Sequence, residues 1–306
     1  MSLRRFCRLA ALLVLGMATA ANAITVTGTQ NTTALVDALL GGGGTGIQVT
    51  GVTLSGHQDT FDLSTPELPN VATFTSSGTY TNGSGTYGIG GGVVLTTGGV
   101  ESVPSFSYPG YGDGPNNLEN ASWAYGGPGV PATAAQDILL DPLTGIDPAT
   151  NEPYDHFDTT ELLIQFDMAQ GFDTVSFDVV FGSEEFEEFV GSPYIDAFGM
   201  FLNGTNIAFV GGKPVNIDHP DMATTAGTEL DGVLAPGGTP RMTFSGAVNP
   251  TGNTLRFIVT DTSDAIYDTT VYFSALRGET VPEPATGALL VAGAAGLLVA
   301  ERRRRR

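Results

Sequence analysis

The chain has 306 residues and is acidic, with 32 Asp and Glu against 12 Lys and Arg and a formal net charge of −20. This balance excludes a nucleic-acid-binding protein, because nucleic acids bind basic surfaces. The single cysteine is Cys7, so the chain beyond the first residues can form no internal disulfide and offers no thiol nucleophile.

Residues 1–23 have the three zones of a secretory signal peptide. Arginines at positions 4, 5 and 8 precede the apolar run Leu9–Ala20, and a small-x-small cleavage site ends at Ala23. The alternative is a buried N-terminal helix. We expect signal peptidase to cleave after Ala23 and the mature protein to begin at residue 24.

The mature chain begins with one predicted helix and then changes to strand patterns. Asn31–Gly41 has a capping residue at its start, apolar residues on one side and a glycine at its end. Strand patterns follow at Ile47–Leu54 and Gly91–Leu95. Residues 102–131 and 141–158 are rich in turn formers or acids and are predicted to be loops.

The last third of the chain alternates apolar and polar residues with a period of two. The apolar positions are Leu162 to Met168, Val175 to Phe181, Phe198 to Leu202, Ile207 with Phe209, Leu255 to Val259, and Val271 to Ala275. Because no helical pattern separates them, they predict an all-β fold, an antiparallel β-sandwich or jelly-roll-like domain over residues 24–281 with one short N-terminal helix.

Three of these predicted strands end in an acid on the apparent core face. If the alternation continues by one or two pleats, Glu185, Asp196 and Asp261 share the side of their strands' apolar residues. A buried carboxylate is costly unless it is hydrogen-bonded, paired or bound to metal.

Few basic residues are present to pair with these acids. Once both chain ends are removed, the remaining basic residues are Lys213, Arg241, Arg256 and Arg277.

These acids have neighbours that make a metal site the favoured interpretation. The full predicted set is Glu184, Glu185, Asp196, Asp261, Asp264 and Asp268. Carboxylates with hydroxyls and carbonyls nearby, and with no cysteine or histidine among them, suit calcium. Two alternatives stay open: acids that cap loops by hydrogen bonds, and acids that catalyse a reaction.

Several of these segments resemble the choice-of-anchor L domain. The segments are Phe181–Phe186, Phe189–Ser192 with Asp196–Gly199, Asp261–Asp268 and the earlier Gly91–Gly98, so that the resemblance covers roughly residues 31–278. The family's usual tyrosine after the paired glutamates is Phe186 here. The resemblance implies a surface-displayed module attached to one of several anchors, and it supplies no known activity.

The C-terminus has the pattern of a sorting tail over residues 282–306. Pro282-Glu283-Pro284 precedes the charge-free run Ala285–Ala300, and Arg302–Arg306 closes the chain. A helix of that length is about 24 Å long, a short membrane span. The arginines would hold its end in the cytoplasm.

This tail resembles the PEP-CTERM sorting signal. The resemblance implies a Gram-negative host, passage through the inner membrane, and processing by an exosortase near Pro282, Glu283 and Pro284. It also implies an association with exopolysaccharide and a final place at the cell surface or in the extracellular matrix.

The sequence thus favours a non-catalytic structural or adhesive module stabilised by calcium. The alternative is a polysaccharide-active hydrolase that uses acids of segment 184–188, since glycosidases use paired carboxylates. Serine hydrolysis is disfavoured, because no Gly-x-Ser-x-Gly motif exists and none of His57, His156 and His219 lies near a convincing nucleophile in the sequence. Sugar-stacking aromatics are suggested by Tyr108, Tyr111, Trp123 and Tyr125.

Overall fold

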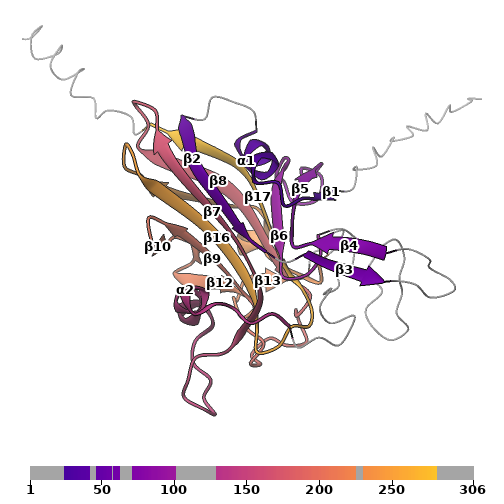
Figure 1. Cartoon of the computed structure of the whole chain (residues 1–306). Helices are drawn as coiled ribbons and strands as arrows, with labels where there is room; N and C mark the ends of the chain where they lie inside the picture. The colour runs from indigo at the N-terminus through magenta and orange to yellow at the C-terminus, as the bar shows by residue number, and fades with distance from the viewer. Residues whose placement is uncertain are drawn as a thin grey trace, which may run out of the picture.

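The computed structural model describes residues 24–41, 46–56, 58–62, 71–100, 129–224 and 230–280. These residues form two antiparallel β-sheets that face each other across an apolar core, together with two helices (Figure 1). The predicted all-β sandwich is therefore confirmed. A separate hairpin of β3 (Gln58–Asp62) and β4 (Val71–Thr75) extends from the body.

The two sheets are named here sheet A and sheet B. Sheet A has the order β1 (Thr25–Gly28), β5 (Ser77–Thr81), β6 (Gly92–Thr96), β17 (Thr269–Glu279), β8 (Thr174–Ser183), β14 (Gly232–Leu234) and β13 (Met222–Ala223), with β15 (Met242–Ala247) also pairing β8. Sheet B has the order β11 (Phe209–Val210), β12 (Lys213–Asn216), β9 (Ala197–Leu202), β16 (Asn253–Thr262), β7 (His156–Met168) and β2 (Ile47–Ser55), with β10 (Thr205–Asn206) also pairing β9.

The predicted alternation accounts for most of the core between the sheets. The inward positions of β7, β8, β9 and β16 all pack into one cluster, as their period of two requires. In β2 a register shift between Val49 and Gly51 keeps Val52 on the side of the core after the bulge.

Two predicted core positions are wrong. A register shift between Ser274 and Arg277 in β17 turns Ala275 outward, with φ +55°, and brings Leu276 into the core instead. Phe209 lies in the short strand β11 and is 47% exposed, because that strand only pairs β12 at the margin of sheet B.

Helix α1 (Thr32–Leu40) matches the predicted helix. The Asn31 side chain accepts hydrogen bonds from the N–H groups of Thr33 and Ala34, and Gly41 ends the helix in the left-handed conformation. Its buried face, with Leu35 and Leu39, packs against β6 and β17 and joins the core cluster.

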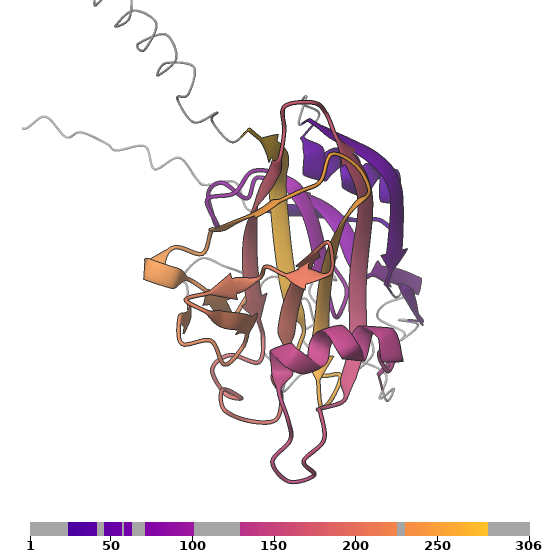
Figure 2. The same cartoon turned by 90° about the vertical axis from the view of Figure 1, so that its left-hand side faces the viewer.

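Helix α2 (Ala134–Thr144) corrects the predicted loops, because Asp141 lies in a helix and the described chain has two helices rather than one. Thr133 and Gln136 form a capping box at its start. Leu140 and Leu143 pack on Phe201 and Ile258 at the outer face of sheet B. Figure 2 shows α2 lying across that face.

The sorting segments 1–23 and 282–306 lie outside the described residues, as do His57, Tyr108, Tyr111, Trp123 and Tyr125. Within the described ranges, no helix is long and apolar enough to span a membrane.

A candidate cation site at one end of the sandwich

Six strand ends meet at the same end of the molecule. The ends of β8 and β6 pair with the start of β17, and the end of β16 pairs with the starts of β7 and β9. The register pairs are Ser183 with Thr269, Thr96 with Thr270, Thr262 with His156, and Thr260 with Ala197. The residues just beyond these ends therefore lie between the edges of sheets A and B.

The predicted acids are gathered at this end and are mostly buried. Glu184 is 7% exposed, Glu185 and Asp196 are each 1% exposed, and Asp261 and Asp268 are 0% exposed. Asp264 is partly buried. We call these six residues the carboxylate cluster.

Asp261 is the most deeply placed member. Burial raises its pKa well above 3.8, and the nearby carboxylates of Asp196, Asp268 and Asp158 raise it further, while Thr97 lowers it in part. Neither carboxylate oxygen of Asp261 has a hydrogen bond of good geometry. The fold thus buries Asp261 completely while giving its carboxylate few favourable interactions.

Asp196 is better satisfied by hydrogen bonds than Asp261. Its Oδ1 accepts from the Thr262 N–H at 2.9 Å and its Oδ2 from the Thr269 hydroxyl at 2.7 Å. Burial raises its pKa to about 7; these two hydrogen bonds lower it, and nearby Asp264 adds a smaller increase. Since Thr269 starts β17 in sheet A and Asp196 precedes β9 in sheet B, this contact joins the two sheets.

Glu185 connects the buried acids to the outer ones. Burial raises its pKa to about 10, and the carboxylates of Asp196, Asp264 and Glu188 add to the shift. Its Oε2 is buried without a hydrogen-bond partner. Burial also raises the pKa of Asp264. The Asp264 carboxylate caps its own loop by accepting a hydrogen bond from the Ile266 N–H at 3.1 Å.

Glu184 and Asp268 occupy the side of the cluster nearer sheet A. The Glu184 N–H donates to the Asp268 carbonyl at 3.0 Å. A side chain at Gly98 would overlap the Asp268 carboxylate, so glycine alone lets the backbone lie against it. Asp231, which the sequence analysis missed, interacts with Glu184, and burial raises its pKa.

Asp158 is a second acid that the sequence analysis missed. It is 1% exposed, and its Oδ1 accepts from the Val130 N–H at 2.7 Å. A register shift opposite Asp261 lies at this point of β7. Parity along the strand could not have placed it, because the register shift and the positive φ of Asp158 (+45°) interrupt the alternation of β7 between Phe157 and Thr160.

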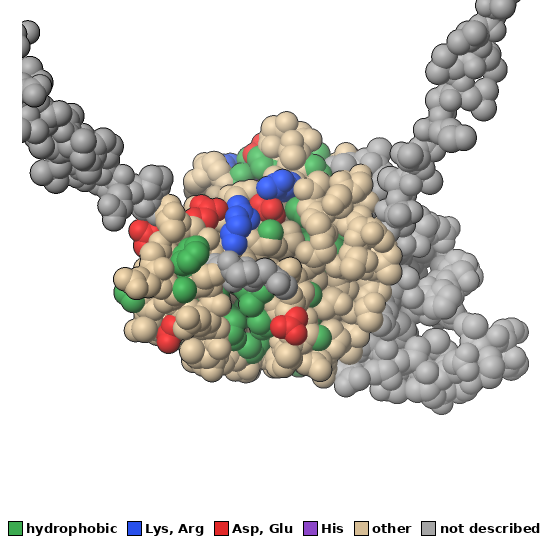
Figure 3. Space-filling view, turned by 90° about the horizontal axis from the view of Figure 1, so that it is seen from above, with side chains coloured by type: hydrophobic (Ala, Val, Ile, Leu, Met, Phe, Trp, Pro, Cys, Tyr) green, Lys and Arg blue, Asp and Glu red, His purple; other side chains and the backbone are tan. Residues whose placement is uncertain are grey.

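The three arginines of the described ranges form ion pairs elsewhere. Arg241 pairs with Asp178 at 3.1 Å, Arg256 with Glu161 at 3.3 Å and Arg277 with Glu279 at 3.2 Å. On the face shown in Figure 3, basic side chains likewise lie beside acidic ones. The arginines therefore do not neutralise the carboxylate cluster.

The cluster is not a finished metal cage. Within the part of the chain that the structure describes, no three Asp, Glu, His or Cys side chains stand as a group that could hold a metal ion. A bound cation would require carboxylates to turn toward it and other oxygens to complete its shell.

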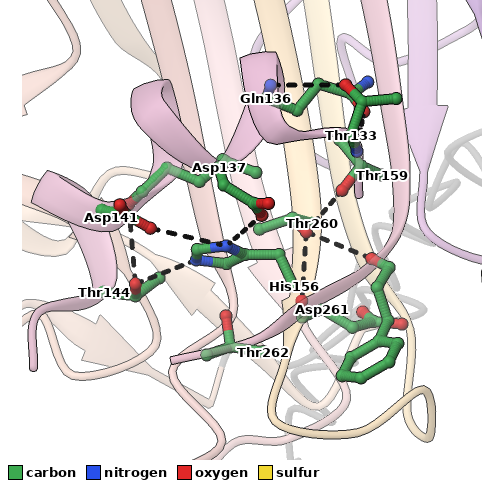
Figure 4. A network of polar contacts seen from close by, with 12 residues as sticks. Thr133, Gln136, Asp137, Asp141, Thr144, His156, Thr159, Thr260, Asp261 and Thr262 are labelled. Carbon is green, nitrogen blue, oxygen red and sulfur yellow. Dashed lines mark hydrogen bonds and ion pairs between the residues drawn. The ribbon is translucent and has the colours of Figure 1, made fainter. Parts of the chain in front are cut away.

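A different polar network fastens α2 to the start of β7 (Figure 4). The buried ring of His156 contacts the Thr144 hydroxyl through Nε2 at 3.0 Å and Asp137 through Nδ1 at 3.1 Å. His156 therefore lies beside a hydroxyl. A catalytic nucleophile must be accessible to its substrate. Here the Thr144 hydroxyl is buried, and the Asp137 carboxylate is the partly exposed group instead.

Comparisons with known proteins identify a family rather than an activity. No curated protein matches the chain. One solved structure, a selenomethionine-labelled β-glucosidase from Kluyveromyces marxianus, is 12% identical with a TM-score of 0.22 over 42% of this chain and 11% of that chain. This partial likeness supports no inference about the fold or the activity of the chain. The model of the Choice-of-anchor L domain matches residues 24–276, and the chain therefore belongs to that family.

Proposed function

We propose that the chain is an exported module with a structural or adhesive role at the cell surface or in the extracellular matrix of a Gram-negative host. Its membership of the choice-of-anchor L family supports display at the surface. The N-terminal pattern ending at Ala23 supports export, and Pro282-Glu283-Pro284 with the tail behind it supports sorting by an exosortase at the inner membrane.

Calcium is the proposed stabilising cofactor of this module. The observation that carries the proposal is the buried carboxylate cluster, which the described arginines leave unneutralised. Several buried negative charges at one point are strongly unfavourable unless they are protonated or bind a cation. Outside the cell, millimolar calcium binds to oxygen ligands of this kind.

Thermal unfolding in calcium and in chelator tests the cofactor. We expect calcium to raise the melting temperature of the protein, since a ligand bound by the folded state alone stabilises it. Asp196→Asn should remove the increase, and Asp37→Asn, a change on the exposed face of α1, should retain it. Identical melting curves in calcium and in chelator would contradict the calcium proposal.

Binding to exopolysaccharide is the proposed adhesive role, and it has a separate test. We expect a glycan array to show binding without release of reducing sugar. Release of sugar that Glu185→Gln abolishes would instead favour the hydrolase. The hydrolase alternative has less support: of the acids in segment 184–188, Glu184 and Glu185 are buried in the cluster, and Glu187 and Glu188 alone are exposed.

A further inference from the structure

We infer that the carboxylate cluster, extended by Asp158, is a clasp in which one divalent cation joins the ends of the two sheets. This inference rests on the proposed calcium binding and adds where the cation acts and what it holds together. Asp158 and Asp261 lie in strands of sheet B and Asp196 directly precedes β9, whereas Glu185 follows β8 and Asp268 directly precedes β17 in sheet A. A cation among them would cross-link strands that are far apart in the sequence.

Unsatisfied buried oxygens point to a ligand at this place. Both carboxylate oxygens of Asp261 and Oε2 of Glu185 are buried without a hydrogen bond of good geometry, and these two residues are at most 1% exposed. Buried polar atoms in native proteins are nearly always satisfied, by protein, by water or by an ion. Asp261 lies in β16 of sheet B and Glu185 lies just beyond the end of β8 in sheet A, so that one ion able to satisfy both must lie between the ends of the two sheets.

The protein already bridges the sheets here with uncharged groups. Thr269 donates to Asp196 at 2.7 Å and lies 2.8 Å from the Ser183 hydroxyl, while its N–H donates to the Thr97 hydroxyl at 2.9 Å. These hydroxyls bring sheets A and B together beside the carboxylates. They also supply neutral oxygens of the kind that complete a calcium shell.

The chemistry of the donors selects the class of cation. All the charged groups are carboxylates, which favour hard cations over zinc or copper. Calcium accepts irregular shells of 6–8 oxygens, whereas magnesium requires a near-octahedral arrangement and gives up water reluctantly. Acids that come from five separate strand ends therefore suit calcium, which tolerates an irregular shell, better than magnesium.

Hydrogen exchange of the full-length protein tests whether the cation joins both sheets. We expect calcium, compared with chelator, to slow amide exchange by about tenfold both in sheet A, at the end of β8 and the start of β17, and in sheet B, at the end of β16 and the start of β9. Protection confined to the strand ends of one sheet would overturn the clasp and leave calcium binding itself standing. Absence of any calcium effect would overturn both.

The pair Asp158→Asn and Asp155→Asn tests the added ligand. Asparagine at position 158 keeps an oxygen for the Val130 N–H, so the fold should be retained. We expect Asp158→Asn to weaken calcium binding by about tenfold or more. Asp155 is exposed three residues earlier, and its variant should bind calcium within about twofold of the parent protein. Equal affinities of the two variants would remove Asp158 from the site.

Discussion

Individual acids of the cluster are held in a state that opposes their charge. Asp196 is buried and has its pKa raised from 3.8 to about 7, although it accepts two hydrogen bonds. Glu185 has its pKa raised from 4.5 to about 10. A folded state that prefers the neutral acid loses stability as the pH rises, because the unfolded chain ionises first.

We therefore predict that the calcium-free protein becomes less stable between pH 5 and pH 8. The contribution of Asp196 is fully present below about pH 4 and is lost as the pH rises through about 7. Urea unfolding in chelator at several pH values measures this loss, and Asp196→Asn should flatten part of it. A free energy of unfolding that rises between pH 5 and pH 8 would contradict the raised pKa of Asp196.

The position of several site residues was predictable because strand parity is a local rule. Glu185, Asp196 and Asp261 continue the apolar side of their strands, and the structure buries all three. Asp158 stood in a segment predicted to be a loop, and a register shift interrupts the alternation of β7 at this point. Asp231 could not be found in this way, since its place depends on the pairing of β14 with β8.

At the scale of single elements, α2 shows where periodicity was insufficient. Its sequence contains Pro142 and two acids, and its apolar contacts are with strands distant in the chain. Because tertiary packing and the capping box at Thr133 outweigh weak helix propensity, the helix forms where a loop was predicted. The bulge in β17 is a similar case, since only pairing with β8 reveals that Ala275 faces outward.

We predict that α2 depends on its buried leucines. Leu140→Ala should lower the free energy of unfolding by about 2–4 kcal/mol, because Leu140 is completely buried against sheet B. Ile138→Ala on the same helix is the matched control, with a side chain 73% exposed, and should change it by less than about 0.5 kcal/mol. Equal effects in urea denaturation would mean that α2 is not anchored as described.

At the scale of the whole molecule, the sandwich has a core closed at one end by acids. The layer between the sheets is apolar, but six strand ends leave carboxylates where the two sheets meet. The overall architecture followed from alternation along the chain. The strand order within each sheet did not, because pairing between distant segments leaves no local pattern.

Processing also belongs to the whole molecule. We predict that the protein recovered from the producing cells starts at residue 24 and lacks Arg302–Arg306, since both ends have the patterns of removable sorting signals. Intact-mass spectrometry of the secreted or surface-bound protein measures this. A mass that includes the arginine cluster would indicate a retained membrane anchor.

Calorimetric titration of the purified protein with calcium tests the central claim most directly. The carboxylate cluster predicts saturable binding of calcium that Asp261→Asn abolishes and Asp37→Asn leaves unchanged. A titration without saturable binding at millimolar calcium, or one that Asp261→Asn does not alter, would contradict it.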